Sequence, residues 1–499
     1  MASSANKHAD KHEHNYTALQ APSNGDNAKR FADMGITAVW TPPPTKAASA
    51  SSTGYDIYDT RDLGEFTHPR DEKAGVQPPN RTKYGTRKQL EAAMQELRKH
   101  GISIYVDAVL NHRMGADELQ TFKARMVDQN DRNKFVSEPY DIEGWTKFTF
   151  PCRGDKYSNF KWGKHWATDA DKENGNYAML MGADCDHEHP DVRKDVLDWG
   201  AWMMRTFPIA GFRFDAVKHV SRRFIHDFVK HIRQEARKLR EERGLEPADQ
   251  SKGPIAFSVA EFWKDSLDSC LKYLTEFGDE QFCLFDAPLH YNFKEAGDGA
   301  ENYDLRKIFD GSIVQARPVD AVTLVDNQDT QKGQALESTV PAQFKPLAYA
   351  LILMRIDGYP CVFLGDLDGC NPTGIENGEG KAEPMADLAK FVKSRKYYAY
   401  GEQKDYWDHP NCIAWVRTGT KSDDGSGYDA SATIICNGSG QGSKWVEVGK
   451  QYVGQKFVDV IGWFQGQSKV NDDGWVEVHC HPRSASIWVP ENSKHREFF

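Results

Sequence analysis

Short β-branched runs alternate with amphipathic helical stretches from about residue 36 to residue 395. Seven runs have the composition of strands: 36–42, 102–112, 211–219, 255–263, 283–289, 321–330 and 359–366. Apolar residues between them recur at spacings of three and four, which predicts helices that pack one face on a sheet. Three such stripes are Leu90/Met94/Leu97, Val192/Val196/Trp199/Met203 and Phe224/Phe228/Ile232. Strand–helix alternation over this length predicts a parallel sheet.

Two parallel architectures fit this alternation, an open doubly wound sheet and a closed eight-stranded barrel. Polar residues gather at the C-terminal ends of most strands: Asp107, Asn111, His112, Arg213, Asp215, Glu261, Asp326, Asn327 and Asp329. A barrel brings all these ends to one rim, where its active site is built, whereas an open sheet uses a single switch point. We therefore expect an α/β fold with a (β/α)8 TIM barrel, whose first strand has a weak signal near residues 15–20.

Two segments interrupt the alternation and predict further domains. Residues 113–189 are irregular and rich in Trp, Gly, Asn and Asp, which indicates a small inserted domain after strand three. After residue 396 short alternating runs separated by Gly and Asp turns indicate a C-terminal antiparallel β-sandwich over 396–499. The barrel then comprises 16–112 and 190–395, and the polar residues 1–15 form a disordered tail.

Composition and charge exclude several classes of function. The net charge is −10, with no basic stripe, so we expect no nucleic-acid partner. The longest apolar run is too short to span a bilayer, and residues 1–15 contain no apolar signal segment. The odd set of nine cysteines has no CxxC spacing and predicts free thiols in a reducing compartment. We expect a cytoplasmic protein that does not bind membranes and is a monomer.

Three of the strand-end residues are acids, namely Asp215, Glu261 and Asp329. Retaining glycoside hydrolysis needs a carboxylate nucleophile and a carboxylic acid about 5–5.5 Å apart, and neighbouring strand ends supply that spacing. Arg213 lies on the same strand face as Asp215 and favours its ionised form, while Phe262 and Trp263 give Glu261 apolar neighbours. Any one strand-end acid can instead serve as an ion-pair or capping residue, but the set of three beside Arg213 favours catalysis.

Four ordered segments carry a family resemblance: "DAVLNH" (107–112), "GFRFDAVKH" (211–219), "AEFW" (260–263) and "VDNQDT" (325–330). They resemble the signature segments of the α-amylase family of retaining glycoside hydrolases, known as family 13. Further stretches such as "GITAVWTPP", "YDTRDLGEF" and "NGNYAMLMGADCDHEHPDV" resemble its liquefying bacterial-type subgroup, including intracellular fungal α-amylases. The resemblance covers nearly the whole chain from about residue 28.

The resemblance implies a role for each matching residue. Asp215 would be the nucleophile, Glu261 the acid/base and Asp329 the transition-state stabiliser, with Arg213 positioning the nucleophile. The implied substrate-binding residues are Tyr55, His112, Arg213, Lys218, His219, Trp263 and Gln328. It also implies a calcium ion held by Asn111, Asp184 and the backbone carbonyl of His219.

The sequence departs from the family pattern at three places. Gln328 stands where the family normally has a sugar-contacting histidine, and glutamine keeps hydrogen bonding but carries no charge. Ala178 stands where relatives usually carry an aspartate ligand, which predicts a weakened calcium site. The aromatic-rich motif expected after "TALQ" is missing, so strand one is short.

The function implied is an α-amylase that cleaves internal α-1,4-glucosidic bonds of starch, glycogen or maltooligosaccharides with retention. Two alternatives use the same residues. If a sugar hydroxyl replaces water, the enzyme is a 4-α-glucanotransferase that makes or trims short α-glucan primers, for example for cell-wall α-glucan. Gln328 and the short first strand are also compatible with a catalytically weakened glucan-binding protein.

Overall fold

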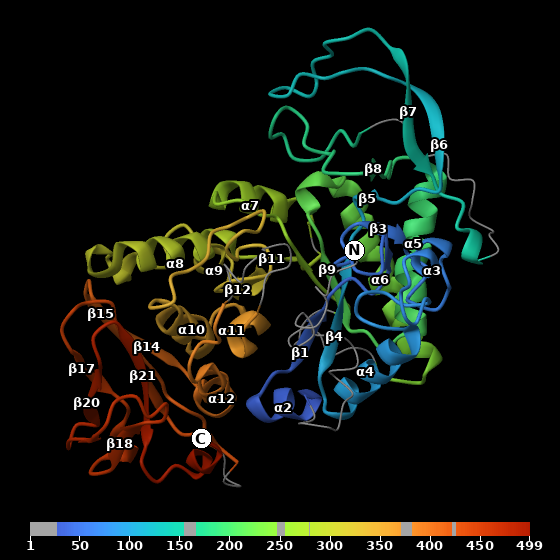
Figure 1. Ribbon diagram of the computed structural model, residues 1–499. Helices are drawn as coiled ribbons and strands as arrows, with labels where there is room; N and C mark the ends of the chain where they lie inside the picture. The colour runs from blue at the N-terminus through green and yellow to red at the C-terminus, as the bar shows by residue number, and fades with distance from the viewer. Residues whose placement is uncertain (1–26, 154–165, 247–254, 279, 371–381, 422–425) are drawn as a thin grey trace, which may run out of the picture. The chain divides into compact units, whose positions relative to one another are not determined.

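The computed structural model describes residues 27–153, 166–246, 255–278, 280–370, 382–421 and 426–499 (Figure 1). The chain divides into two compact units. The first contains Thr37–Trp263 with flanking segments up to Ala32 and from Tyr273 to Cys283, and the second contains Asp33–Ile36, Lys264–Lys272 and Leu284–Phe499. Among the described residues, no helix has both the length and the apolar character needed to cross a membrane. The weak first strand and the predicted tail lie outside the described residues.

The first unit is built on four parallel strands in the order β1-β4-β9-β10. Their bounds are β1 Ala38–Thr41, β4 Ser103–Ala108, β9 Gly211–Phe214 and β10 Phe257–Ala260. In register, Asp107 of β4 lies opposite Arg213 of β9, and Ala260 of β10 lies opposite Phe214. Parallel neighbours point in one direction, so the polar residues that end these strands meet at one edge.

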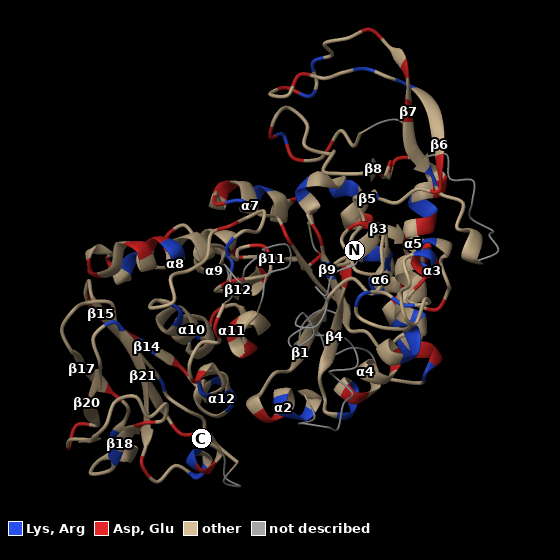
Figure 2. Cartoon of the chain, in the orientation of Figure 1, with Lys and Arg blue, Asp and Glu red and all other residues tan. Residues whose placement is uncertain are grey.

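Helices follow these strands and bury the predicted stripes. They are α2 Asn27–Met34, α3 Pro69–Lys73, α4 Arg87–Lys99, α5 Pro190–Thr206, α6 Arg222–Glu242 and α7 Leu267–Thr275. The stripes predicted for α4, α5 and α6 are all buried. The helices of this unit carry many blue and red residues in Figure 2, whereas strands β1 and β10 contain no charged residue. Helix α4 begins with a capping box of Thr86 and Gln89, and Gly101 follows its end at φ +74°, a left-handed conformation that glycine adopts readily after a helix.

The irregular segment after β4 contains mostly antiparallel pairs. A long hairpin joins β6 Glu118–Ala124 to β7 Tyr140–Lys147, and a short pair joins β5 His112–Arg113 to β8 Ala183–Asp184. A further short pair, β2 Lys46–Ala47 with β3 Ile57–Asp59, precedes β4 in the chain. Tyr58, Phe148 and Phe150 form a small buried cluster beneath the hairpin. Lys46 and Asp71 form a buried ion pair nearby, at 2.5 Å. The hairpin β6–β7 and strand β8 lie within residues 113–189, the segment predicted as an inserted domain, and its boundaries at 113 and 189 stay a prediction.

The second unit continues the strand–helix alternation with three parallel strands in the order β11-β12-β13. These strands are β11 Cys283–Phe285, β12 Ala321–Leu324 and β13 Tyr359–Cys361. The accompanying helices are α8 Ala287–Gly299, α9 Ile313–Ala316, α10 Lys345–Met354, α11 Leu364–Asp368 and α12 Leu388–Tyr398. Helix α10 is buried along its length from Leu347 to Met354, which explains its apolar sequence. The alternation predicted for a (β/α)8 catalytic domain is therefore present in both units.

Several strands are shorter than their sequence runs. The run 283–289 ends as a strand at Phe285, because Asp286 caps helix α8 by accepting the Leu289 N–H and Pro288 lies in the first turn. The run 359–366 likewise ends at Cys361 and gives way to α11. In the run 321–330 the strand ends at Leu324, and Asn327 then closes a turn through its side chain. Hydrophobic runs locate a strand, whereas capping residues set its end.

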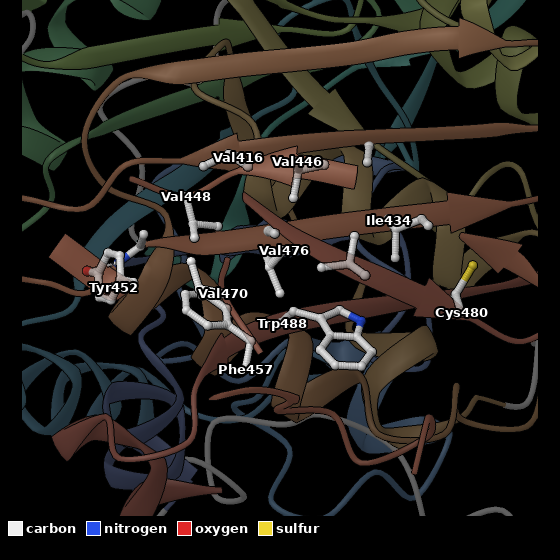
Figure 3. Packing of buried hydrophobic residues seen from close by; sticks show 14 of the residues in the cluster. Val416, Ile434, Val446, Val448, Tyr452, Phe457, Val470, Val476, Cys480 and Trp488 are labelled. Atoms are coloured by element: carbon white, nitrogen blue, oxygen red, sulfur yellow. Dashed lines mark hydrogen bonds between the residues drawn. The ribbon is translucent and has the colours of Figure 1, made fainter. Parts of the chain in front are cut away.

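The C-terminal part of the second unit is the predicted antiparallel sheet domain. Its strands are β14 Gln403–His409, β15 Cys412–Arg417, β16 Ser431–Cys436, β17 Gly442–Glu447, β18 Lys456–Asp459, β19 Gln467–Lys469, β20 Trp475–Cys480 and β21 Ser484–Pro490. A six-stranded sheet of order β14-β15-β16-β21-β18-β19 packs against the β17-β20 pair. Val416, Ile434 and Trp488 meet Val446 and Val476 in the core between them (Figure 3).

Candidate active site

Arg213 is the centre of a charged cluster at the strand ends of the first unit. Its side chain is fully buried. Nη1 donates to both carboxylate oxygens of Asp107 at 3.0 and 2.9 Å and to Oδ1 of Asp215 at 2.7 Å, and Nη2 donates to Glu261. Burial disfavours the guanidinium charge, but the three carboxylates outweigh it and raise the pKa of Arg213 well above its usual value. One cation thus joins three acids from three neighbouring strands.

Asp107, at the end of β4, is the acid of the cluster that accepts the most hydrogen bonds from its neighbours. Besides Arg213, it accepts hydrogen bonds at Oδ2 from the Tyr55 hydroxyl and the Trp40 indole N–H, each at 3.0 Å. Burial, with a contribution from the charge of Asp215, raises its pKa to about 7, although Arg213 and Tyr55 favour the ionised form. The Arg213 guanidinium also lies 4.6 Å from the Trp40 ring centroid. Asp107 is one of the predicted strand-end residues but is not among the predicted site residues.

Asp215 and Glu261 occupy equivalent positions at the ends of adjacent strands. The Asp215 N–H donates to the Ala108 carbonyl, and the Glu261 N–H donates to the Phe214 carbonyl, which extends the parallel ladder by one residue. The next residue, Ala216, has a left-handed backbone at φ 44° and ends the strand geometry. A non-glycine residue in this region is strained, and such residues concentrate at functional sites. The prediction that Arg213, Asp215 and Glu261 gather at one point agrees with this placement.

Tyr55 and His112 lie beside this cluster as well. His112 Nε2 is 2.8 Å from the backbone oxygen of Tyr55 and donates to it as the N–H tautomer. Burial lowers the pKa of His112, so the ring stays neutral near pH 7. The Tyr55 ring lies 5.9 Å from the Arg213 guanidinium. A neutral imidazole and a phenol ring are therefore fixed next to the acids.

Lys218 and His219 follow the cluster on the short turn after β9. His219 Nδ1 is 2.6 Å from the Tyr177 carbonyl oxygen, and the two rings pack at 4.5 Å. Lys218 lies 4.9 Å from the Tyr177 ring centroid and 3.3 Å from Glu173. Trp263 is buried. Tyr177, which orders both predicted sugar contacts, was missed, because nothing in its local sequence distinguishes it from a core aromatic.

Asp329 and Gln328 belong to the second unit. The Asn327 side chain accepts the backbone N–H groups of Asp329 and Thr330 at 2.8 and 3.0 Å, which fixes the turn. Gln328 Nε2 donates to Asp329 Oδ2 at 2.9 Å. The residue that replaces the usual histidine therefore contacts the predicted transition-state stabiliser directly. How Asp329 approaches Asp215 stays a prediction.

Two family models match the chain. The α-amylase catalytic domain matches residues 28–408, and the α-amylase C-terminal domain matches residues 432–489. The chain belongs to the α-amylase family. It is thus a glycoside hydrolase of the group that its four sequence segments resemble.

Curated relatives of this α-amylase family member match over nearly their whole length. A glucan 1,4-α-maltohexaosidase of Bacillus sp. strain 707 is 42% identical over 489 residues, covering 93% of this chain and 88% of that protein. An α-amylase of Bacillus licheniformis is 39% identical, covering 95% and 92%. A cytoplasmic α-amylase of Escherichia coli K12 is 35% identical, covering 94% and 95%.

Solved α-amylase structures share the fold at low sequence identity. The α-amylase of Geobacillus thermoleovorans complexed with acarbose superposes with a TM-score of 0.59 at 17% identity, covering 94% of this chain and 91% of that chain. An α-amylase from Malbranchea cinnamomea superposes with a TM-score of 0.58 at 17% identity, covering 95% and 89%. These likenesses support the fold of the catalytic and C-terminal domains.

The residues implied for calcium form an oxygen-rich group next to the acid cluster. The Asn111 side-chain amide faces the Ala178 carbonyl at 3.3 Å and the His219 carbonyl at 3.1 Å. With its nitrogen toward them the amide donates to both; with its oxygen toward them, three neutral oxygens converge, as an oxygen-preferring cation requires. Ala178, which lacks the carboxylate, thus faces Asn111 through its backbone.

Asp184, the acid that the resemblance adds to this group, pairs with His112 across strands β5 and β8. Burial and the charge of Asp186 raise the pKa of Asp184 to about 8, and no cation pairs with it among the described residues. No group of three or more His, Cys, Asp or Glu side chains suited to a metal occurs in the part of the chain that the structure describes. The possible calcium ligands here are therefore one amide oxygen, two carbonyl oxygens and one carboxylate.

Proposed function

We propose that this protein is an α-amylase that hydrolyses internal α-1,4-glucosidic bonds of starch, glycogen or maltooligosaccharides with retention of configuration. The observation that carries the proposal is the single guanidinium of Arg213, which bonds the carboxylates of Asp215 and Glu261 at the ends of adjacent strands. Adjacent strands lie about 4.7–4.9 Å apart, which is close to the about 5–5.5 Å between the two acids of a retaining enzyme. The names of the amylase and maltohexaosidase relatives agree with this substrate class.

In this proposal each of the three acids has a distinct catalytic role. Asp215 attacks the anomeric carbon and forms the glycosyl-enzyme, and Glu261 first gives a proton to the leaving oxygen and later takes one from water. The Arg213 guanidinium orients Asp215 through the bond at 2.7 Å. Asp329 stabilises the positive charge that develops on the sugar, and Gln328 orients Asp329 through its amide.

The remaining residues hold the glucan. Tyr55 stacks on the sugar that is cleaved, and the neutral His112 beside it hydrogen-bonds a hydroxyl. Lys218 and His219, ordered by Tyr177, contact the leaving-group sugars, and Trp263 lines the same region. We further propose that residues 113–189, 16–112 with 190–395, and 396–499 act as insert, barrel and C-terminal domains.

Calcium belongs to this proposal as a weakly held ion. Asn111, the carbonyls of His219 and Ala178, and Asp184 would hold it, and it would fix the inserted segment to the end of β4 and to the turn after β9. Calcium affinity follows the number of charged ligands, and Asp184 is the acid of this set. The cytoplasm is the proposed location, supported by nine free thiols and by the cytoplasmic relative.

Product analysis of Asp215→Asn and the wild type tests the proposal. Wild-type protein incubated with maltoheptaose should give shorter products, whose anomeric configuration at early times is α. The Asp215→Asn variant should lose about 10⁴-fold or more in rate while remaining folded, because it lacks the nucleophile but keeps the shape. Longer products would instead identify a glucanotransferase, and a variant within tenfold of the wild type would exclude Asp215 as nucleophile.

A further inference from the structure

A polar and aromatic cavity lies within the second unit, between residues that follow β11 and strand β14. Its volume is about 370 Å³, which falls within the about 300–1,000 Å³ typical of small-ligand sites. Its wall includes Phe309, Thr323, Arg355, Asp405 and Trp407. The strand-end residues proposed for catalysis, Gln328 and Asp329 included, are not part of this wall. None of the roles assigned above uses this cavity.

Two wall residues carry buried polar atoms without a partner. Thr323 is only 1% exposed, and neither its hydroxyl nor the buried indole N–H of Trp407 has a hydrogen-bond partner among the described residues. Leaving a buried donor or acceptor unpaired costs about 1–3 kcal/mol. A hydroxyl and an indole N–H on one cavity wall could both be satisfied by a ligand that carries hydroxyl groups.

The arginines of the wall are already paired and do not form an anion site. Arg355 makes a bidentate ion pair with Asp405 at 2.7 and 3.0 Å, and Arg306 makes another with Asp304 at 2.9 and 2.7 Å. The exposed acids Asp310 and Asp357 add negative charge to the wall. A phosphate or carboxylate ligand would meet net repulsion, whereas hydroxyl groups can donate to these acids.

The apolar part of the wall suits the C–H face of a pyranose ring. Phe309 and Trp407 lie nearly parallel, with ring centroids 5.9 Å apart, and Arg355 packs over both rings. The ion pair with Asp405 fixes Arg355 and therefore fixes both rings before any ligand arrives. Flat aromatic surface, hydroxyl acceptors and unpaired donors together are the requirements of a neutral sugar.

We infer that this cavity is a second, non-catalytic binding site for glucosyl units of an α-glucan. The ligand class rests on the proposed function, since glucan is the polyhydroxylated molecule that the chain would act on. A long glucan held at this site as well as at the acid cluster gains avidity, because the second contact becomes intramolecular. A short oligosaccharide that reaches one site alone gains nothing.

Calorimetric titration of Asp215→Asn with maltoheptaose tests the site, because the silent variant does not consume the ligand. Two classes of binding site are expected. Adding Trp407→Ala should weaken one class at least tenfold and leave the other unchanged. Thr323→Val keeps the shape and removes only the hydroxyl, and it should weaken the same class about threefold or more. Identical titrations for the parent and Thr323→Val, or a single class of site in the parent, would overturn the inference.

Kinetics provide the second readout and separate this inference from the proposed function. In an otherwise wild-type chain, Trp407→Ala should raise KM for glycogen severalfold while kcat/KM for maltotetraose stays within twofold. Equal effects on both substrates would overturn a separate glucan site. If Asp215→Asn retains hydrolysis, the assignment of Asp215 as nucleophile fails whatever the titration gives. If it is silent and the second class is missing, only the cavity inference fails.

Discussion

Replacing Asp107 by asparagine tests whether the stability and the activity of the acid cluster depend on the Asp107 carboxylate. The carboxylate accepts two bonds from Arg213 and one each from Tyr55 and Trp40. Three of these four bonds use Oδ2, so the amide of the introduced asparagine would keep its oxygen there and turn its N–H₂ toward Arg213 Nη1. Two donors would then face each other in a fully buried place.

The structure sets the size of the effect. Removing one partner of a buried ion pair costs about 3–5 kcal/mol, but Arg213 keeps Asp215 and Glu261, so we expect about 2–4 kcal/mol. For a chain of 499 residues that unfolds as one unit, this corresponds to a fall in melting temperature of about 2–4 °C. Activity on maltoheptaose should fall at least about tenfold, because Arg213 and Tyr55 both lose an anchor.

Asp71→Asn provides a matched control. Asp71 is equally buried and pairs with Lys46 at 2.5 Å, away from the acid cluster. Both variants should unfold at lower temperature in a thermal melt, but only Asp107→Asn should lose kcat. A melting temperature for Asp107→Asn within about 1 °C of the wild type, or an equal loss of kcat in Asp71→Asn, would refute the positioning role of Asp107.

Three further predictions follow from the same contacts. Glu261→Gln should stop hydrolysis of maltoheptaose but recover most of its rate on glycosides whose leaving group needs no proton; activated substrates that are not rescued would remove Glu261 from the acid role. Chelation should lower the melting temperature by only a few degrees, since a weak site at micromolar calcium contributes under about 1 kcal/mol, and Ala178→Asp should widen that gap; no widening would show that position 178 does not face the ion. Burial lowers the pKa of His290 to about 4. The neutral ring therefore contributes on the order of 1–3 kcal/mol to stability at neutral pH, and this contribution is lost as pH falls from about 6.5 toward 4. His290→Gln should reduce the difference in melting temperature between pH 7 and pH 5, whereas replacement of the exposed His481 by glutamine should not.

The sequence was sufficient to predict the alternation of strands and helices and the acids at the strand ends. Helical stripes such as Leu90, Met94 and Leu97 are buried as expected, since period 3.6 maps directly onto one helix face. Capping is less visible in a hydrophobic run, so the run 283–289 predicts strand at residues 287–289, although these residues begin helix α8. The register between neighbouring strands is even harder to predict from a single sequence than capping. The pairing of Asp107 with Arg213 was therefore not predicted.

The surroundings of Glu261 could not be predicted from its neighbours in the sequence alone. Its neighbours Phe262 and Trp263 suggested apolar surroundings, and both are buried. Yet its carboxylate also accepts a hydrogen bond from the guanidinium of Arg213, which comes from the adjacent strand. Neighbours in sequence alternate between the two faces of a strand, so they are poor guides to what a side chain meets.

The net charge of the cluster affects the protonation of its acids. Three buried carboxylates around one guanidinium leave an excess of negative charge, and burying such an excess is costly. Burial accordingly raises the pKa of Asp107 to about 7, so a proton resides within the cluster over part of the neutral range. A sugar that enters between Asp215 and Glu261 excludes more water and strengthens this demand. Asp107 is one of the three carboxylates whose charges meet at Arg213, and its replacement by asparagine removes one of those charges. Asp107→Asn should thus shift the pH dependence of kcat/KM as well as its magnitude, and an unchanged pH profile would show that Asp107 acts through geometry alone.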